Sequence, residues 1–523
     1  MKKLITISFL LLTVFTLQAQ EQPNVLMIVL DDLNNFVGVM GGHPQAKTPN
    51  IDKLADEGVL FNNAHSNAPI CIASRASFMT GVSPITSKFW GFGNWLKNDM
   101  LMNSKTLPEY FRENGYQTIQ TGKVFHANKK GAYDNDGIVA DYGPMAYNGK
   151  KAAIHPSNPP EMLELGPLDA TFAPLSDVPD VKAATNTPGY SGWYNTHRKT
   201  KGPFHYNSEE DRDLLTDEKS AQWAVENLQK LASKNNGEPF FMSVGFIRPH
   251  TPLVVPQKYF DMFPLDEVQI PFIKKNDRED TKLANNSDKE SRGRKAYRTL
   301  TESSLYSDAD EALRTYTQAY LASIAFADDM VGIVLDALEN STFKDNTVVV
   351  LFSDHGYNIG EKEYLFKYAL WEQSTQVPLI IRHPLYRETA GSKVSHPVGL
   401  IDIYPTLAEI AALKGETKIS TAGAGLNGFS LVDFLKDPNA KWQGPDVAIS
   451  VITSWRSKEA SKQHLSVRSK DYRYTRYLNG DEELYDHTND PHEWNNLAND
   501  KQYKKIKAAL AKQLEAELER LAP

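Results

Sequence analysis

Apolar runs of strand length alternate with amphipathic segments over the first four-fifths of the chain. Residues 24–30 and 346–352 are almost entirely apolar, which is typical of parallel strands buried on both faces. Residues 308–340 carry apolar side chains at helical spacing and predict one long helix. This alternation predicts an α/β domain with a mostly parallel sheet flanked by helices. The other predicted strands are 59–62, 116–121, 239–246 and 378–382, and the other predicted helices are 48–58, 74–80, 106–114, 216–233 and 402–412.

The pattern changes after about residue 435. Three short segments there resemble antiparallel strands, and residues 502–521 form an amphipathic segment rich in strong helix formers. We therefore predict one large α/β domain over residues 20–435 and a small subdomain over residues 436–523, with an antiparallel sheet and one helix. The three predicted strands are 447–453, 464–467 and 472–477.

Three segments lack a clear period. Residues 127–215 are rich in Gly, Pro, Asn and Tyr, and we expect long surface loops that shape a cleft. Residues 274–298 are charged and nearly devoid of apolar side chains, which predicts a mobile excursion. Residues 371–377 are predicted to form a loop.

The N-terminus predicts export. Two lysines, an apolar run over residues 4–17 and a small residue, Ala19, fit a signal peptide over residues 1–19. The run is shorter than the roughly 20 apolar residues of a spanning helix, so we expect no membrane span and a periplasmic or secreted protein. The net charge is -8 and the pI is near 5.9, so the composition gives no sign of a basic surface that would bind nucleic acid.

Polar residues end both long apolar runs. Asp31 and Asp32 follow the first run, and Asp354 and His355 follow the second. An isolated Asp pair is more often a turn or a helix cap. Because the carboxyl ends of parallel strands form the functional edge of open α/β sheets, the two pairs together favour a shared site.

Cys71 is the only cysteine, so no disulfide can form within the chain. Most free cysteines are simply small buried hydrophobes. Here, however, Ala73 and Arg75 follow at two-residue intervals, and Thr80 and Gly81 close the segment. This pattern resembles the signature of type I sulfatases, Cys-x-Pro/Ala-x-Arg followed by Thr-Gly, in which an activating enzyme oxidises the cysteine to formylglycine.

Further motifs in matching order make the chain most similar to the iduronate-2-sulfatase group and related bacterial polysaccharide sulfatases. The resemblance implies an alkaline-phosphatase-like fold and a sulfuric ester hydrolase. It also implies a formylglycine-generating enzyme as a partner. Ala73 stands where the oxygen-dependent activator prefers proline, whereas the radical-type bacterial activator accepts alanine, and the sequence leaves open which one serves this chain.

A calcium site is expected from the same residues. Asp31, Asp32, Asp354 and His355, with the modified Cys71, form an oxygen-rich set that suits one Ca²⁺ better than Mg²⁺. The imidazole is unusual for calcium, although histidine occupies this position in the sulfatases that the chain resembles. The ion would lower the pKa of the attacking hydroxyl and screen an anionic ester.

The resemblance assigns the remaining catalytic roles. Arg75 would orient the formylglycine hydrate, and Lys123 and Lys367 would contact sulfate. His126 would accept a proton during aldehyde collapse, and His250 would protonate the leaving sugar oxygen. Lys123 and His126 are three residues apart, so on a helical turn they would share a face. Taken singly, each of the lysines and histidines is as well explained as a surface or structural residue.

The expected substrate is a sulfated polysaccharide or its oligosaccharides, such as a glycosaminoglycan or ulvan. Two alternatives remain: a phosphodiesterase or phosphonate hydrolase of the same superfamily, and a non-catalytic glycan-binding protein if Cys71 stays a thiol. Aromatic and arginine side chains could contact sugar rings or a carboxylate, although core packing explains each one better. These candidates are Trp90, Trp95, Trp193, His197, Trp371, Arg473 and Arg476.

Overall fold

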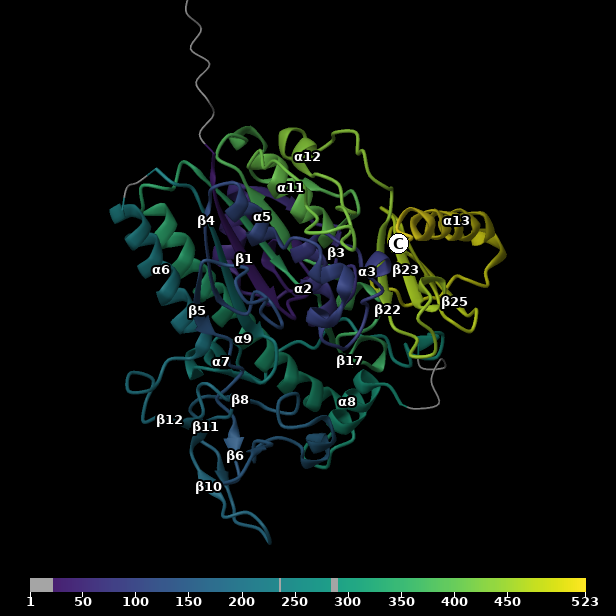
Figure 1. The fold of residues 1–523 in the computed structure, drawn as a ribbon. Helices are drawn as coiled ribbons and strands as arrows, with labels where there is room; N and C mark the ends of the chain where they lie inside the picture. The colour runs from purple at the N-terminus through teal and green to yellow at the C-terminus, as the bar shows by residue number, and fades with distance from the viewer. Residues whose placement is uncertain (1–21, 235–236, 284–289) are drawn as a thin grey trace, which may run out of the picture.

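An eight-stranded sheet forms the centre of the protein (Figure 1). The computed structural model describes residues 22–523 except 235–236 and 284–289, so the predicted signal peptide lies outside the described residues. All strands of the sheet but β19 run in the same direction, which confirms the predicted α/β class. In spatial order the strands are β20 (Ser392–Val394), β2 (Val59–Phe61), β19 (Leu379–Arg382), β15 (Thr347–Ser353), β1 (Asn24–Asp31), β13 (Phe240–Pro249), β4 (Gln117–Gly122) and β5 (Asn135–Val139).

Side chains of β1 alternate between two apolar layers. Leu26 and Ile28 pack on one face of the sheet, and Val25 and Met27 pack on the other. Both faces are therefore covered, as an unbroken apolar strand requires. The first layer includes helices α1 (Pro49–Glu57), α6 (Thr216–Lys234), α7 (Gln257–Asp261), α8 (Arg292–Thr301) and α9 (Ala309–Glu339). The second includes α2 (Cys71–Thr80), α3 (Pro84–Ser87), α4 (Asp99–Met102), α5 (Leu107–Glu113), α11 (Ile403–Ile410) and α12 (Val432–Lys436).

The long helix predicted over residues 308–340 is confirmed as α9. Asp308 caps it, because its carboxylate accepts a hydrogen bond from the Glu311 amide at 2.8 Å. Tyr316 and Tyr320 are buried in the core, as their spacing predicted.

Three local predictions were wrong. Helix α2 begins at Cys71 rather than at residue 74. Residues 372–375 form a short helix, α10 (Glu372–Thr375), because Arg468 and Arg473 hold the Glu372 carboxylate in the interior. The charged segment is partly structured in its described residues, 274–283 and 290–298. Asp277 is buried 2.9 Å from Lys362 Nζ, and α8 begins at Arg292.

The segment 127–215 contains short paired strands rather than loops alone. They project at one end of the molecule, where Figure 1 labels β6, β10, β11 and β12. The pairs are β6 (Ala146–Tyr147) with β7 (Ala152–Ala153), β9 (Asp180–Val181) with β10 (Tyr190–Ser191), β11 (Trp193–Asn195) with β12 (Gly202–Phe204), and β8 (Phe172–Pro174) with β14 (Leu253–Val255). Strands of two or three residues are too short for the hydrophobic pattern to reveal.

The C-terminal residues form a four-stranded antiparallel sheet with one helix, beside the main sheet in Figure 1. The three predicted strands are confirmed, and a fourth, β25, was missed. The sheet contacts the segment before Cys71, because the Val451 amide donates to the Asn67 carbonyl at 3.0 Å. The elements are β22 (Ala448–Ile452), β23 (His464–Arg468), β24 (Tyr472–Arg476), β25 (Glu482–Asp486) and α13 (Lys504–Arg520).

Small sheets lie close to the cysteine segment. β3 (Ala64–His65) is flanked by β18 (Gln376–Val377) and β21 (Val398–Gly399), and β16 (Asn358–Ile359) pairs with β17 (Leu365–Phe366). Within the described ranges, none of the helices combines the length and apolar character needed to cross a membrane.

Candidate active site

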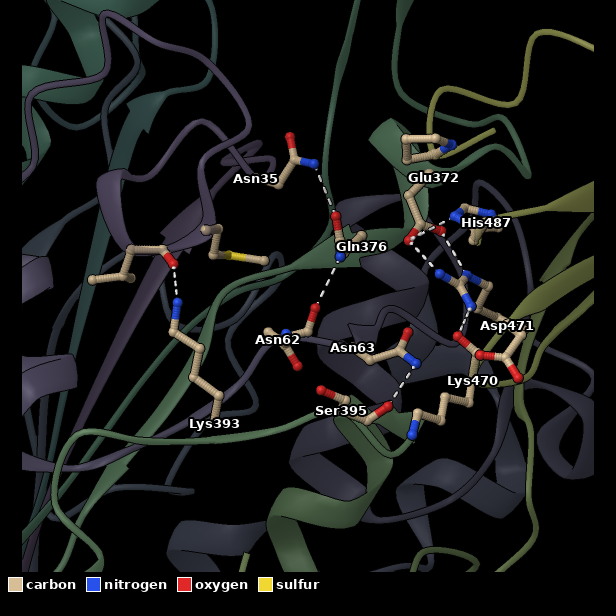
Figure 2. A pocket seen from close by; sticks show the side chains of 14 residues that line it. Asn35, Asn62, Asn63, Glu372, Gln376, Lys393, Ser395, Lys470, Asp471 and His487 are labelled. Carbon is tan, nitrogen blue, oxygen red and sulfur yellow. Dashed lines mark hydrogen bonds and ion pairs between the residues drawn. The ribbon is translucent and has the colours of Figure 1, made fainter. Parts of the chain in front are cut away.

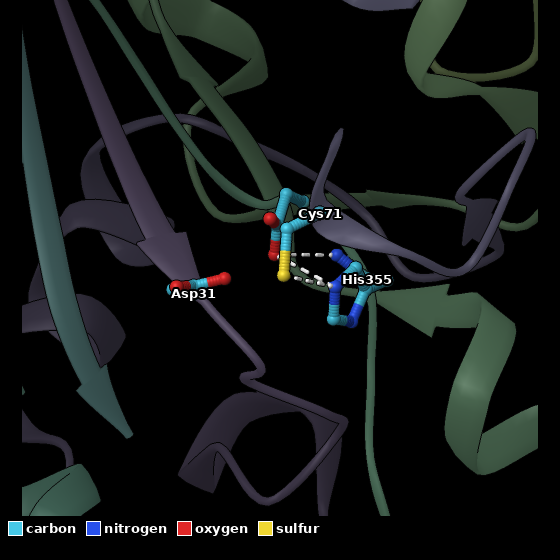
Figure 3. Close-up of side chains that lie close together, drawn as sticks. Asp31, Cys71 and His355 are labelled. Carbon is cyan, nitrogen blue, oxygen red and sulfur yellow. Dashed lines mark hydrogen bonds and ion pairs between the residues drawn. The ribbon is translucent and has the colours of Figure 1, made fainter. Parts of the chain in front are cut away.

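Cys71 is the first residue of α2, and its side chain is buried at the carboxyl edge of the main sheet. Its Sγ lies 3.2 Å from His355 Nε2 and 3.2 Å from Lys367 Nζ. Figure 3 shows the sulfur between Asp31 and the imidazole of His355. The predicted strand-end residues therefore surround the single cysteine, although they come from segments far apart in the chain.

The neighbouring strands β1 and β15 deliver the carboxylates. Side chains alternate along a strand, so Asp31 and Asp32 would point to opposite faces if the strand continued. Asp32 instead adopts a left-handed conformation with φ +65°, which aspartate tolerates better than most residues. Its amide donates to Asp354 Oδ1 at 3.3 Å, and its carbonyl accepts from the Tyr320 hydroxyl at 2.6 Å.

Arg75 ties the cluster together from one turn further along α2. Its Nε donates to Asp354 Oδ2 at 2.8 Å, and its Nη2 lies 3.5 Å from Asp31 Oδ1. Nη1 donates to the carbonyls of Lys123 and Val124. Because the side chain is fully buried and has these partners, Arg75 fixes the two strand ends relative to each other.

Lys123 reaches the same cluster from the end of β4, where its Nζ contacts Asp31 Oδ2. Two glycines allow this close approach. A Cβ on Gly122, whose φ is +70°, would lie 1.9 Å from the Gly245 carbonyl oxygen, and a Cβ on Gly245 would lie 2.1 Å from the Lys123 carbonyl. The expectation that Lys123 and His126 share a helical face was wrong, because residues 123–127 form a bend.

His126 lies at the exposed rim next to Lys123. Desolvation in the crowded rim, followed by the charge of Lys123, lowers the pKa of His126 to about 4. In the described part of the chain it makes no hydrogen bond to the cluster. The ring is therefore uncharged at neutral pH.

His250 and Lys367 flank the cysteine from other loops. Lys367 Nζ lies 2.8 Å and 3.0 Å from the two Asp32 oxygens, and His250 Nε2 lies 3.8 Å from Asp32 Oδ2. His250 Nδ1 lies 2.6 Å from the Thr251 carbonyl, which assigns the proton to Nδ1 and leaves Nε2 directed at the cluster.

Tyr142 also belongs to the site, although the sequence did not single it out. Its ring lies 4.7 Å from Lys123 Nζ and 5.0 Å from the His250 ring, measured to the centroids. It comes from the aperiodic segment 127–215, where no local pattern separates a site residue from a loop residue. The Tyr142 ring therefore packs against both Lys123 and His250.

The donor set fits a hard divalent cation. One ligand atom each from Asp31, Cys71, Asp354 and His355 lie within 4.8 Å of one another. Asp32 forms a second such group with Cys71 and His250. Among the described residues, Asp31 Oδ1 is a buried carboxylate oxygen without a hydrogen-bond donor. Carboxylate oxygens are the ligands that hard divalent cations prefer.

The electrostatics of the three carboxylates differ. Burial alone would raise the pKa of Asp31, but Lys123, His250 and Arg75 hold it well below its usual value. Burial raises the pKa of Asp32 to about 8 and that of Asp354 to about 6, against the effects of Lys367 and Arg75 respectively. A bound cation would keep all three carboxylates ionised.

The thiol itself is a poor nucleophile here. Burial and the charge of Asp31 raise the pKa of Cys71 above its usual range, so the thiolate is disfavoured at neutral pH. An unmodified cysteine would therefore be a weak attacking group in this position.

Most of the aromatic and arginine candidates for sugar contact are buried in the core. Trp95 and Trp193 are each 1% exposed, and their indole nitrogens donate to backbone carbonyls. Trp90 and Trp371 are also buried. Arg476 is paired with Glu515, and His197 lies in a turn among the short strands. Core packing therefore explains the four tryptophans, as expected for each one singly.

A second cluster of acidic and histidine side chains lies away from Cys71. Glu372, His487 and Glu493 offer ligand atoms within 4.8 Å of one another, but Arg473 pairs with both glutamates. A polar cavity of about 370 Å³ adjoins it (Figure 2). None of the candidate catalytic residues lines this cavity, which is bordered by Asn35, Asn62, Asn63, Glu372, Gln376, Lys393, Ser395, Arg468, Lys470, Asp471 and His487.

Comparisons with known proteins agree with this site. The sulfatase family model matches residues 23–413, and the model of the N-sulphoglucosamine sulphohydrolase C-terminal region matches residues 360–520. A sulfatase of Formosa agariphila is 34% identical over 94% of this chain and 86% of its own length. The mouse iduronate 2-sulfatase is 27% identical over 93% of this chain and 92% of its own.

The fold is shared with solved structures of related chemistry. The phosphonate monoester hydrolase of Agrobacterium radiobacter superposes with a TM-score of 0.66 at 22% identity, over 95% of this chain and 96% of that one. This similarity establishes the fold alone. The family model and the identity to the Formosa protein, together with the cysteine-centred cluster, assign the chemistry. The chain therefore belongs to the sulfatase family and is a sulfuric ester hydrolase.

Proposed function

We propose that the protein is a formylglycine-dependent and calcium-dependent sulfatase that removes sulfate from a sulfated polysaccharide or its oligosaccharides. The observation that carries the proposal is the position of Cys71. Its Sγ lies 3.2 Å from both Lys367 Nζ and His355 Nε2, at the edge where Asp31 and Asp354 end adjacent strands. A cysteine that served only to fill the core would not need three carboxylates beside it.

Modification of Cys71 would supply the missing nucleophile. As an aldehyde hydrate, the residue offers one hydroxyl for attack on sulfur and a second that allows sulfate to leave when the aldehyde re-forms. Asp31, Asp32, Asp354 and His355 would hold a calcium ion, which supplies charge that lowers the pKa of a nearby hydroxyl. Arg75, buried against Asp354 and Asp31, would keep this arrangement rigid.

The two lysines would bind the sulfuryl oxygens. Lys123 is paired with Asp31, and Lys367 is paired with Asp32. Asp31 lowers the free energy of the charged Lys123, and Asp32 does the same for Lys367, so the pKa of each amine stays above its usual value despite burial. Fixed cations in a water-poor site stabilise negative charge that develops on the ester oxygens.

Two histidines would move protons. His250 Nε2 lies 3.8 Å from Asp32 Oδ2, and His250 would protonate the departing sugar oxygen. Burial and Lys367 hold its pKa well below the usual value, and the negative ester would offset this by favouring the charged ring. His126, neutral because its pKa is about 4, would accept a proton from the hydroxyl at position 71.

The substrate class rests on the relatives. The mouse relative is named iduronate 2-sulfatase, which supports a sugar in or beside a uronate-containing chain for this protein. A glycosaminoglycan fragment or an algal polymer such as ulvan fits that description. Because the protein has a net negative charge, it would bind such a polyanion through the local cations Arg75, Lys123 and Lys367.

Peptide mass spectrometry tests the nucleophile. Protein co-produced with an activating enzyme should carry residue 71 as the aldehyde, lighter by the difference between a CH2SH and a CHO group. Cys71→Ala should abolish sulfate release from a panel of defined sulfated oligosaccharides. Active material with a fully unmodified cysteine, or appreciable turnover by Cys71→Ala, would contradict the proposal.

Metal analysis tests the ion. Asp354→Ala removes a ligand and one partner of Arg75, so it should lose bound calcium and turnover together. Chelation followed by dialysis should remove activity from the unchanged protein, and Ca²⁺ should restore it better than Mg²⁺. Full activity in metal-free protein would exclude a catalytic calcium.

One alternative within enzymes is a phosphonate or phosphodiester hydrolase, since a phosphonate monoester hydrolase has the same fold. Matched aryl esters of sulfate, phenylphosphonate and phosphate decide between them. A kcat/KM on the phosphorus esters above that on the sulfate ester would favour the alternative. A glycan-binding protein without catalysis would instead bind the oligosaccharides, carry an unmodified thiol and release no sulfate.

A further inference from the structure

Two exposed aromatic rings stack on each other near the cysteine segment. Trp455 is 68% exposed and Phe92 is 54% exposed. Their ring centroids lie 6.0 Å apart, and the planes differ by 11°. Phe92 comes from the loop after α3, and Trp455 comes from the loop after β22, so the pair joins the α/β domain to the C-terminal sheet.

Tyr368 connects this pair to the active site. Its ring centroid lies 5.2 Å from that of Phe92, and its hydroxyl accepts a hydrogen bond from the Thr453 amide at 3.1 Å. Its own amide donates to the Pro69 carbonyl at 3.0 Å, two residues before Cys71. The preceding residue, Lys367, contacts the Cys71 sulfur. The three rings therefore lead from the surface to the residues beside the nucleophile position.

Two of the three rings belong to residues with a strained backbone conformation. Trp455 has φ +59° and Tyr368 has φ +72°, in the left-handed region that bulky residues rarely adopt. Strained conformations of this kind persist where the surrounding structure demands them, and they concentrate at functional sites. Gly91 permits the contact, because a Cβ there would lie 3.3 Å from the Tyr368 hydroxyl and 3.2 Å from Thr453 Cγ2.

A single exposed aromatic residue needs no explanation, since more than half of a typical protein surface is apolar. The Trp455 and Phe92 pair differs in three ways. The two rings are nearly parallel, and Trp455 has a strained backbone conformation. Tyr368, which contacts Phe92, directly follows Lys367 of the active site. Exposure of the indole ring of Trp455 to water is unfavourable, which indicates that a ligand covers it.

We propose that Trp455 and Phe92 form an aromatic platform that binds a pyranose ring of the substrate, next to the sulfated sugar in the active site. The C–H groups of one sugar face carry partial positive charge and pack against the negative face of an aromatic ring. Rigid rings lose little conformational entropy on contact. The platform would make the enzyme prefer oligosaccharides over single sugars. This inference rests on the glycan substrate proposed above.

A chain-length comparison tests the platform. The probes are tetrasaccharides from heparin, chondroitin sulfate and ulvan, with the corresponding sulfated monosaccharides, and free sulfate is measured. The ratio of kcat/KM for the tetrasaccharide to that for the monosaccharide should fall about tenfold in Trp455→Ala. It should fall further in the double variant Phe92→Ala/Trp455→Ala, and Trp455→Phe should recover part of the loss.

Phe272→Ala provides the matched control. Phe272 is also an exposed aromatic residue, at 56%, but it packs against His492 instead of the platform. Its removal should leave the ratio unchanged. A ratio in Trp455→Ala within twofold of the unaltered protein, or an equal loss on both substrate lengths, would overturn the platform. Thermal unfolding of each variant separates loss of fold from loss of contact.

A binding measurement separates the platform from the proposed function. Calorimetric titration of the same tetrasaccharides into the full-length Cys71→Ala protein needs no turnover. At least one should bind, with a Kd about tenfold higher when Trp455→Ala is added. Equal Kd values, or binding by none of the three, would overturn the platform. Platform-dependent binding without sulfate release by the unaltered protein would instead overturn the proposed reaction.

Discussion

Lys367 bridges Asp32 and Cys71. Its Nζ lies 2.8 Å and 3.0 Å from the Asp32 oxygens and 3.2 Å from the Cys71 sulfur, and the whole group is buried. Burial favours the neutral amine, but the Asp32 carboxylate holds the pKa of Lys367 well above its usual value. A permanent cation therefore stands within contact distance of the position where sulfate would be attacked.

Replacing Lys367 by Met should lower kcat/KM for sulfate release by about 100-fold or more, because a preorganised charge is lost at the developing anion. Initial rates with an aryl sulfate measure this directly. Lys393→Met is the control, since Lys393 is exposed and its Nζ donates to the Val39 carbonyl. A loss of less than about threefold would remove Lys367 from the sulfate site.

Replacing His250 by Ala should affect substrates according to their leaving groups. A sugar alkoxide needs a proton as it departs, whereas an activated aryl oxide leaves without one. Sulfate release from a sugar sulfate should therefore fall about 100-fold or more, against a much smaller loss on 4-nitrophenyl sulfate. Equal losses on both esters would argue against His250 as the acid.

Replacing Arg473 by Met should destabilise the fold without touching the active site. Arg473 is fully buried and pairs with Glu372 and with Glu493 at 2.6 Å, so its loss removes a cation from two buried carboxylates and leaves them Arg468 and His487 as partners. Breaking such a pair costs about 3–5 kcal/mol. Thermal unfolding should show a clear fall in Tm.

Arg387→Met is the control for that change. Arg387 and its partner Asp345 are both well exposed, and surface pairs contribute about 0–1 kcal/mol. A similar fall in Tm for the two variants would mean that the Arg473 network adds little to stability.

Replacing Glu361 by Gln should change the pH dependence of stability. Burial raises the pKa of Glu361 to about 7, above the value of about 4.3 in an unfolded chain. Between these values the folded protein holds a proton that the unfolded chain has lost, so the native glutamate costs stability as the pH rises through this window. Gln carries no such charge.

The Tm of Glu361→Gln relative to the unaltered protein should therefore rise from pH 4.5 to about 7 and then level off. Thermal scans at half-unit steps measure the difference. A difference that stays constant with pH would show that Glu361 does not titrate in this range.

Much of the catalytic edge could be predicted from local pattern. The runs at 24–30 and 346–352 are apolar at successive positions because both faces of each strand are buried. An unbroken apolar run of this length therefore predicts a buried strand from the sequence alone. Strands in one parallel sheet end at a common edge, so Asp31 and Asp354 had to approach each other once the runs were identified.

Other features depended on packing between distant segments. The amphipathic pattern did not reveal α10, since four residues are too few for a period, and its Glu372 is held by arginines about 100 residues away. The spacing of Lys123 and His126 would place them on one face of a helical turn, but these residues form a bend after the close contact between Gly122 and Gly245.

The sequence by itself determined six of the eight strands of the main sheet, the long helix and the motif around Cys71, because burial period and motif spacing are local properties of the chain. Only the tertiary structure decided which aromatic residues are available to a substrate. The tryptophans that composition offered are mostly buried, whereas Trp455 is exposed and stacked on Phe92. Exposure depends on which segments, hundreds of residues apart, pack over a side chain, and no local pattern carries that information.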